Sequence, residues 1–392
     1  MPQIAQSDTI GRFNEVASEL EKLKKNDMYR SLPFVKVAGG GMVADRAGNK
    51  LVDLSSNDYL ALAGDETLRE EFFRLCKPKS FSSSSSRLMS GFDTDTVELE
   101  NRISRDYNRE AALIFSSGYH ANTSILPAIC NSDTLILADK LVHASLIDGI
   151  RLSKCEFRRF EHNNMKSLER ILESKHADYK HIIIVSESTF SMDGDKCDLR
   201  FLVELKHRFD NVLLYIDSAH DVGTTGNKGL GEPEEQGVLN EIDFIVATFG
   251  KGLASYGAFV VCDGIVKEFL VNKARGLIFS TALSPIQMQW TRFVWEQLPN
   301  FADRRTSLAA NASYFRSQLQ AKGIQTPSAS HIVPIIIGQA SETLRKSEQL
   351  RSAGFHCLAV RPPTVPQNLC RLRLSINSAM TKRELDAVLA CL

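Results

Sequence analysis

Three residues whose chemistry is reactive, Asp217, His220 and Lys251, lie within one stretch of the chain, residues 215–258. Asp217 and His220 follow the apolar run 212–216, and Lys251 follows a second apolar run that ends at Thr248. Two buried strands therefore deliver polar side chains at their carboxyl ends, where open α/β sheets bind ligands. A lysine that can form a Schiff base, beside a carboxylate that keeps a pyridine nitrogen protonated, suits pyridoxal 5'-phosphate.

Each of these residues also has an ordinary interpretation. An aspartate at a strand end often caps a helix, and a lysine after a glycine is often a solvated loop residue. Lys251, however, lies between Gly250 and Gly252, and small neighbours let the backbone approach a ligand closely. A phosphate-binding loop is excluded because Gly252 replaces the Ser or Thr of that motif and residue 245 is not glycine. The sequence favours a Schiff-base lysine.

The elements that must position these residues alternate between short apolar runs and helical periodicity from residue 94 to residue 285. This alternation predicts an α/β fold with a mostly parallel sheet and crossover helices. Strands are expected at 111–115, 134–139 and 182–186. The stretch 116–122 turns from a strand into a helix at Gly118, which is either a phosphate site or an ordinary tight turn.

The two ends of the chain show different patterns. An amphipathic helix is expected over residues 8–29, followed by a hairpin around 46–49. A long helix is expected to lead to residue 322, and strands near 331–337 and 371–376 enclose a helix over 341–353. The chain is therefore divided into an N-terminal segment (1–53), a large α/β domain (54–288) and a smaller α+β domain (289–392).

Composition excludes several classes of function. Lys plus Arg and Asp plus Glu both number 47, so nothing indicates binding to nucleic acid or to an anionic membrane surface. The longest apolar runs are strand-sized, and the first residues lack the pattern of a secretory signal. Eight scattered cysteines, without a Cys-x-x-Cys pair, fit a cytoplasmic protein without a disulfide framework, and no cluster has metal-ligand spacing.

Several motifs together resemble those of the α-oxoamine synthase family, which consists of fold-type-I pyridoxal phosphate enzymes. The resemblance extends from about residue 30 to residue 376. It is carried by Ser56-Asn57-Asp58-Tyr59-Leu60, Ser86-Arg87-Leu88, Ser117-Gly118-Tyr119-His120-Ala121-Asn122, the stretch from Asp139 to Ser145, Glu187-Ser188-Thr189-Phe190-Ser191-Met192-Asp193-Gly194-Asp195 and Thr248-Phe249-Gly250-Lys251-Gly252.

The segment from Val360 to Pro366 most resembles members that condense L-alanine with pimeloyl-CoA or pimeloyl-acyl carrier protein. Four departures are visible. Ser218 stands where the family usually has Glu, Thr96 where a His is common, Ala254 where a Gly is frequent, and a serine run at 82–86 replaces a glycine-rich turn. None of them removes a catalytic group. Three alternatives stay open: a sister synthase that uses glycine or serine, an aminotransferase of the same fold, and a non-enzymatic paralogue.

The resemblance implies roles for residues around the cofactor. Lys251 should form the Schiff base and then remove the alanine Cα proton, Asp217 should pair with the pyridine nitrogen, and His143 should stack on the ring. For His143 the alternative is a helix cap. The cofactor site should also include His220, Glu187, Ser191, Gly118, Tyr119, Thr248 and, across a homodimer interface, Thr281.

The resemblance also implies substrate-binding residues. Arg361 should hold the alanine carboxylate in a bidentate fork, a task that lysine performs poorly. The alternative is a surface arginine at a strand edge. Asn57 is expected to assist with the same carboxylate, and Arg30 is expected to face the acyl substrate.

Overall fold

The central element of the fold is a seven-stranded sheet with the order β4-β10-β9-β8-β7-β5-β6, in a computed structural model that describes residues 12–77 and 80–392. The neighbours from β6 to β9 run parallel, and only β10 runs against the others. The mostly parallel sheet expected from the sequence is thus confirmed. The strands are β4 (Ala111–Phe115), β5 (Thr134–Asp139), β6 (Glu156–Phe160), β7 (His181–Glu187), β8 (Val212–Asp217), β9 (Phe244–Thr248) and β10 (Ala258–Cys262).

Both faces of this sheet are covered by helices. Along β5, Leu135 and Leu137 enter one hydrophobic core, whereas Ile136 and Ala138 enter the other. Such two-sided burial explains why the strands read as continuous apolar runs. One face is covered by α4 (Thr94–Asp106), α7 (Met165–Lys175), α8 (Leu199–Arg208) and α12 (Pro285–Glu296), and the other by α5 (Gly118–Ile129), α6 (Ala144–Ser153), α10 (Gly264–Lys273) and α11 (Arg275–Ile278).

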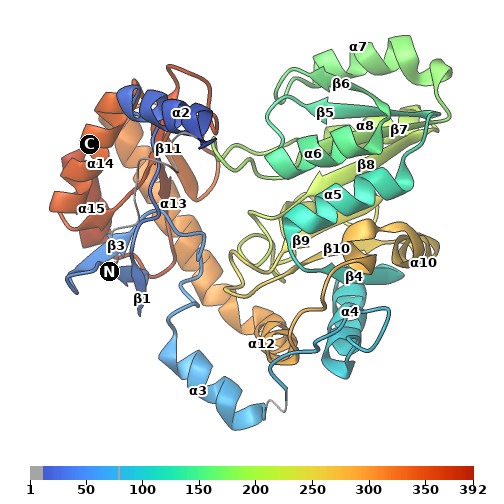
Figure 1. Cartoon of the computed structure of the whole chain (residues 1–392), viewed down its shortest axis with the longest axis horizontal. Coiled ribbons are helices and arrows are strands. Elements are labelled where there is room, and N and C mark those ends of the chain that lie inside the picture. Colours follow the sequence, from blue (N-terminus) through green and yellow to red (C-terminus); the bar gives the residue numbers. More distant parts are fainter. Residues whose placement is uncertain (1–11, 78–79) are drawn as a thin grey trace.

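A second lobe combines both ends of the described chain, seen as blue and orange-red ribbons beside the green and yellow large lobe (Figure 1). Its strands form a sheet of order β1-β2-β3-β12 and a sheet of order β11-β14-β13. The elements are β1 (Lys36–Gly39), β2 (Met42–Ala44), β3 (Lys50–Asp53), β11 (Ile332–Gly338), β12 (Phe355–His356), β13 (Ala359–Val360), β14 (Cys370–Ser375), α13 (Ala302–Ala321), α14 (Ala340–Ser352) and α15 (Lys382–Cys391).

The pairing of β3 with β12 places part of the expected N-terminal segment in a sheet with part of the expected C-terminal domain. Val52 and Leu372 belong to the same hydrophobic core. The expected hairpin is present, because β2 and β3 pair antiparallel from Ala44 opposite Lys50. The three-part division of the chain stays a prediction.

The helix expected to lead unbroken to residue 322 is interrupted. α12 ends at Glu296, a 3-10 turn η2 (Leu298–Phe301) follows, and α13 then begins. Pro299 lies in this turn and has no backbone N–H to continue an α-helix. The remaining elements are α2 (Asn14–Lys25), α3 (Glu66–Leu75), η1 (His176–Asp178) and α9 (Glu232–Glu235).

The helix expected over 8–29 corresponds to α2, and residues 8–11 lie outside the described part of the chain. The apolar residues of its stripe, Phe13, Val16 and Leu20, are exposed in the single chain. Within residues 12–77 and 80–392, no helix has the length and apolar character required to cross a bilayer.

Candidate active site

Polar side chains gather at one edge of the large sheet, where the parallel strands β5, β7, β8 and β9 end. Glu187 is the last residue of β7, Asp217 the last of β8 and Thr248 the last of β9. His143 follows β5, and Lys251 follows β9. Because carboxyl ends of parallel strands meet at the same edge, the fold brings these expected site residues together.

Lys251 and His220 are in direct contact, with 2.8 Å between Lys251 Nζ and His220 Nε2. Burial lowers the pKa of Lys251 to about 8, although the carboxylates of Asp217 and Glu187 act in the opposite direction. Burial, followed by the positive charges of Lys251 and Arg373, holds the pKa of His220 well below its usual value. The pair is therefore an amine that loses its proton more easily than an ordinary lysine, beside an uncharged imidazole.

The orientation of the His220 ring follows from its second nitrogen, which lies 2.7 Å from the hydroxyl of Tyr59. Tyr59 donates its single proton to Asn57 Oδ1 at 2.9 Å, and Arg373 donates to the Tyr59 oxygen at 3.2 Å. His220 Nδ1 must then be the donor to Tyr59. Nε2 is left as an acceptor, and it points at the amine of Lys251.

Asp217 is a buried carboxylate held by two donors. Asn122 donates to Oδ2 at 2.8 Å, and the backbone N–H of Ala219 donates to Oδ1 at 3.0 Å. Asn122 is itself fixed, because Tyr215 donates to its Oδ1 at 2.8 Å. The carboxylate is thus oriented within the buried end of β8, and its charge acts on both Lys251 and His143.

His143 caps helix α6, since its Nδ1 accepts the backbone N–H of Ser145 at 3.2 Å. The helix-cap alternative is therefore a real part of its role. Burial lowers the pKa of His143, whereas Asp217 raises it. The cap fixes the ring beside Asp217 and Lys251, so capping and stacking on a cofactor are compatible.

Glu187 is buried, and its Oε1 has no hydrogen-bond partner within the described part of the chain. Burial, followed by the charge of Asp217, raises the pKa of Glu187 well above its usual value. A buried polar atom without a partner is costly, and such atoms often face a ligand.

The amino end of α5 offers an anion site. Ser117 caps this helix by accepting the N–H of His120 at 3.1 Å. A Cβ added to Gly118 would meet only Thr248 Cβ, at 3.9 Å, so open space lies over the first turn. The amides of a helix N-terminus favour phosphate.

The other expected phosphate residues are placed as follows. The Thr248 hydroxyl donates to Gly257 O at 2.9 Å and accepts the N–H of Gly250 at 3.1 Å. The Tyr119 hydroxyl donates to Asp148. The backbone N–H of Tyr119 lies in the first turn of α5, where helix amides have no partner within the helix. Thr281 is exposed and pairs with Ser86 in an antiparallel bridge.

Taken together, the residues at this edge of the sheet fit pyridoxal phosphate. Lys251 offers an amine for the carbonyl carbon, Asp217 a charge for the ring nitrogen, and the α5 terminus a place for the phosphate. Glu187 Oε1, which has no partner in the described residues, offers an acceptor in the same site.

The two expected substrate arginines lie together near the N-terminal segment. Arg361 donates to Asp27 O and, at 3.2 Å, to Tyr29 O, and its Nε is buried without a partner in the described residues. Arg30 donates to Arg361 O at 3.1 Å and to Pro362 O at 2.6 Å. Both guanidinium groups therefore contact backbone carbonyls.

Arg373 was not singled out from the sequence. It is buried, donates to Ser191 O at 2.6 Å and to Ser375 Oγ at 2.8 Å, and its charge lowers the pKa values of Lys251 and His220. Among the residues that the structure describes, no carboxylate forms an ion pair with it. The available signal was the alternation in β14, which places Arg371 and Arg373 on one face of a buried strand.

Comparison with known proteins identifies the family of the chain. The family described as "Aminotransferase class I and II" matches residues 49–392. A protein of Pasteurella multocida (strain Pm70) named "Putative 8-amino-7-oxononanoate synthase" is 46% identical over 377 residues, covering 95% of this chain and 97% of that protein.

Solved structures are similar over most of the chain. A serine palmitoyltransferase from S. paucimobilis with a bound PLP–myriocin aldimine has a TM-score of 0.87 at 25% identity, covering 97% of this chain and 96% of the other. An 8-amino-7-oxononanoate synthase from Francisella tularensis has a TM-score of 0.74 at 26% identity, covering 87% and 96%. With its cofactor site and these relatives, the chain belongs to the aminotransferase class I and II family, as a fold-type-I, pyridoxal phosphate-dependent α-oxoamine synthase.

Proposed function

We propose that the protein condenses L-alanine with a pimeloyl thioester, carried by CoA or by acyl carrier protein, to give 8-amino-7-oxononanoate, carbon dioxide and a free thiol. Within the family, the observation that supports this particular reaction is the 46% identity to the P. multocida protein over 95% of the chain. The buried pair of Lys251 and His220 beside Asp217 supplies the chemistry that such a reaction requires.

The reaction balances as follows. A bond forms between alanine Cα and the thioester carbonyl carbon, and the carbon–sulfur bond breaks to release the thiol. The alanine carboxyl carbon leaves as carbon dioxide, and a proton takes its place at Cα. Pyridoxal phosphate, when bound, supplies the electron sink that stabilises negative charge at Cα.

Lys251 removes the Cα proton and later returns one. A pKa near 8 leaves a useful fraction of neutral amine at neutral pH, as a general base requires. His220 holds this amine through its Nε2, and Tyr59 fixes the ring. Asp217 would hold the ring nitrogen of a bound cofactor in its protonated form through its negative charge.

We assign the alanine carboxylate to Arg373. Asn57 belongs to the same group of side chains, because the Tyr59 hydroxyl contacts both Asn57 and Arg373. A buried guanidinium without a carboxylate partner is costly unless a ligand compensates its charge. The role of Arg361 inferred from the family motif is the alternative. Arg361 and Arg30, which lie together, are candidates for the free carboxylate of the pimeloyl chain.

A second copy of the chain is part of the proposal. The exposed apolar residues Val16 and Leu20 of α2, with Phe13 at its N-cap, offer surface that another protomer can cover. Thr281 is exposed in the single chain, as a residue of a dimer interface would be. Light scattering on the purified protein tests the homodimer, and a monomeric mass at micromolar concentration would contradict it.

A substrate screen with mass spectrometry of the products tests the proposed reaction. L-alanine, glycine and L-serine are each paired with acyl thioesters of different chain length. We expect consumption only with alanine and a pimeloyl thioester. Preference for glycine or serine would indicate a sister synthase, and pyruvate without carbon dioxide would indicate an aminotransferase.

A further inference from the structure

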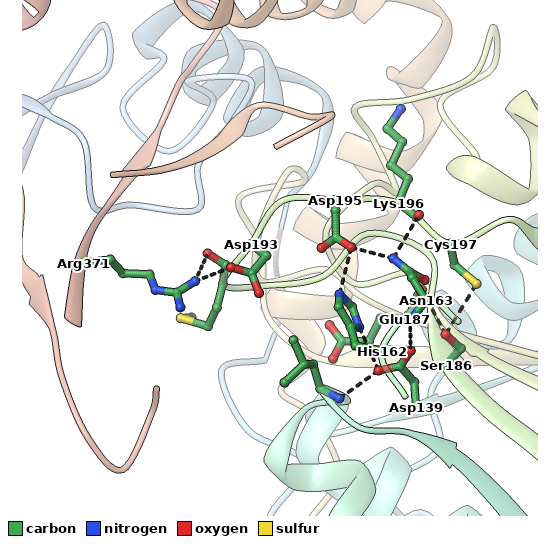
Figure 2. A network of polar contacts seen from close by, with 12 residues as sticks. Asp139, His162, Asn163, Ser186, Glu187, Asp193, Asp195, Lys196, Cys197 and Arg371 are labelled. Atoms are coloured by element: carbon green, nitrogen blue, oxygen red, sulfur yellow. Dashed lines mark hydrogen bonds and ion pairs between the residues drawn. The ribbon is translucent and has the colours of Figure 1, made fainter. Parts of the chain in front are cut away.

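Beside the cofactor site, His162 bridges two carboxylates (Figure 2). Its Nδ1 lies 2.9 Å from Asp139 Oδ1, and its Nε2 lies 2.8 Å from Asp195 Oδ2. An ionised carboxylate only accepts hydrogen bonds, so each ring nitrogen must donate one. This geometry is that of an imidazolium with both nitrogens protonated.

The electrostatics agree with this charge. Partial burial lowers the pKa of His162, but the hydrogen bonds and charges of Asp139 and Asp195 outweigh it and raise the pKa to about 10. The imidazole of His162 also packs edge-on against Phe190, with 4.5 Å between ring centroids. The ring is thus fixed on three sides.

The two carboxylates come from different segments beside the cofactor site. Asp139 ends β5 and also accepts the backbone N–H groups of Leu141 and Asn163, each at 2.8 Å. The short connection 140–143 follows Asp139 directly and carries His143. Asp195 lies in the turn 191–196, which follows Glu187 and begins with Ser191.

Asn163 strengthens the same link. Its side-chain amide donates to Asp195 Oδ2 and, at 3.2 Å, to Lys196 O, so two consecutive residues join the turn 191–196 to Asp139 (Figure 2). The turn is also tied to the smaller lobe, because Arg371 pairs with Asp193 and Arg373 donates to Ser191 O.

We propose that His162 is a positioning residue: as a cation between Asp139 and Asp195, it holds the connection 140–143 and the turn 191–196 together and so places His143 and Ser191 around the cofactor. The proposal depends on the cofactor and not on the identity of the substrates. Without the cation, Asp139 and Asp195 would face each other near the buried Glu187, whose pKa the charge of Asp139 already raises.

A metal ion is the competing interpretation of this cluster, since ligand atoms of His162, Asp193 and Asp195 lie within 4.8 Å of one another. In this arrangement, however, His162 Nε2 donates to Asp195 and Asp193 pairs with Arg371. Both bonds would have to break before these atoms could coordinate a metal.

His162→Gln is the test variant, because glutamine is polar but carries no charge. His207→Gln is a matched control, since His207 is an exposed residue near the end of α8 whose Nε2 lies 3.0 Å from the carboxylate of Glu241. We expect His162→Gln to weaken binding of pyridoxal phosphate about ten- to a hundredfold, as for loss of a charge-assisted hydrogen bond, and to shift the absorption band of the bound cofactor. The control should change neither.

The double variant His162→Gln/Asp195→Asn separates charge from general structure. Removing one of the two repelling carboxylates should restore a large part of the lost affinity. A double variant no better than the single one, or unchanged cofactor affinity and spectrum in His162→Gln, would overturn the proposal. Stabilisation of the wild type by added Zn²⁺, absent in His162→Gln, would assign the cluster to a metal instead.

The wild-type protein offers a test that does not depend on folding of a variant. In protein labelled with ¹⁵N-histidine, both ring nitrogens of His162 should show the shifts of an imidazolium at about pH 8. A neutral ring at this pH would contradict the proposal. This readout and cofactor affinity need no substrate, so a wrong assignment of the acyl donor would leave them unaffected.

Discussion

Lys251 is subject to two opposing influences. Burial disfavours its charged form, whereas the carboxylates of Asp217 and Glu187 favour it, and the balance lowers its pKa to about 8. The uncharged His220 adds a hydrogen-bond acceptor without adding a second positive charge. At the scale of single residues, this balance suits Lys251 to the two roles proposed for it, nucleophile toward the cofactor and base toward the substrate.

Lys251→Ala should abolish turnover and covalent attachment of the cofactor, because no other amine is expected at that position. The protein should still fold, since the change removes a buried polar side chain without opening a charged pair. Borohydride reduction of the wild type followed by peptide mapping checks the assignment. A label on a different lysine would contradict it.

Asp217→Asn should retain the cofactor but slow removal of the alanine Cα proton at least about tenfold, the effect of one pKa unit on the ring nitrogen. A neutral amide cannot favour the protonated ring as a carboxylate does. Exchange of the alanine Cα hydrogen in heavy water, followed by NMR, measures this step without the acyl donor. Exchange at the wild-type rate would make Asp217 purely structural.

Arg373→Ala should raise the KM for alanine and reduce kcat/KM about ten- to a hundredfold, as expected for loss of a charge-assisted contact to a carboxylate. Arg361→Ala should leave alanine kinetics nearly unchanged and raise the KM for the pimeloyl thioester. Steady-state kinetics with each substrate varied in turn distinguishes the two arginines. The reverse pattern would return the alanine carboxylate to Arg361.

At the scale of elements, strand ends were predictable and long-range polar contacts were not. The apolar runs of β5 and β7 identified both strands, and the polar residues after β8 and β9 marked the site. Strands β12 and β13 have two residues each, too few for a periodic signal. The His162 bridge joins residues that are 23 and 33 positions apart, a contact that no local pattern encodes.

The surroundings of Arg361 could be predicted from the sequence only in part. Its neighbours Pro362 and Pro363 indicated a stiff, defined position, and the structure gives it one, but against the carbonyls of Asp27 and Tyr29. Arg373 lies in β14, where polar and apolar residues alternate as in an ordinary strand. Its burial depends on packing between the two lobes, which the sequence of β14 alone does not reveal.

The His162 bridge also predicts how stability changes with pH. A folded-state pKa of about 10, above the ordinary value of about 6.5, means that its contribution is complete below about pH 6.5 and is lost as the pH rises through 10. Between about pH 7 and pH 10, the Tm of the wild type should therefore fall more than that of His162→Gln. Parallel curves from differential scanning calorimetry would contradict this assignment.

At the scale of the whole molecule, the seven-stranded sheet supplies the cofactor edge, and the smaller lobe contributes Arg373 to it. The class of the sheet followed from continuous apolar runs separated by helical periods, since two-sided burial imposes that pattern. The pairing of β3 with β12 joins residues far apart in the chain, so neither segment alone predicts it. The strand ends that form this edge were therefore predictable, whereas the contacts that reach it from the smaller lobe were not.

The most direct measurement of the proposed function uses L-alanine labelled with ¹³C at its carboxyl carbon, mixed with pimeloyl-CoA and the purified protein. We expect one labelled carbon dioxide and one free thiol for each molecule of unlabelled 8-amino-7-oxononanoate, as detected by mass spectrometry. Lys251→Ala serves as the control and should give none. Thiol release without labelled carbon dioxide, or labelled pyruvate in its place, would contradict the proposed condensation.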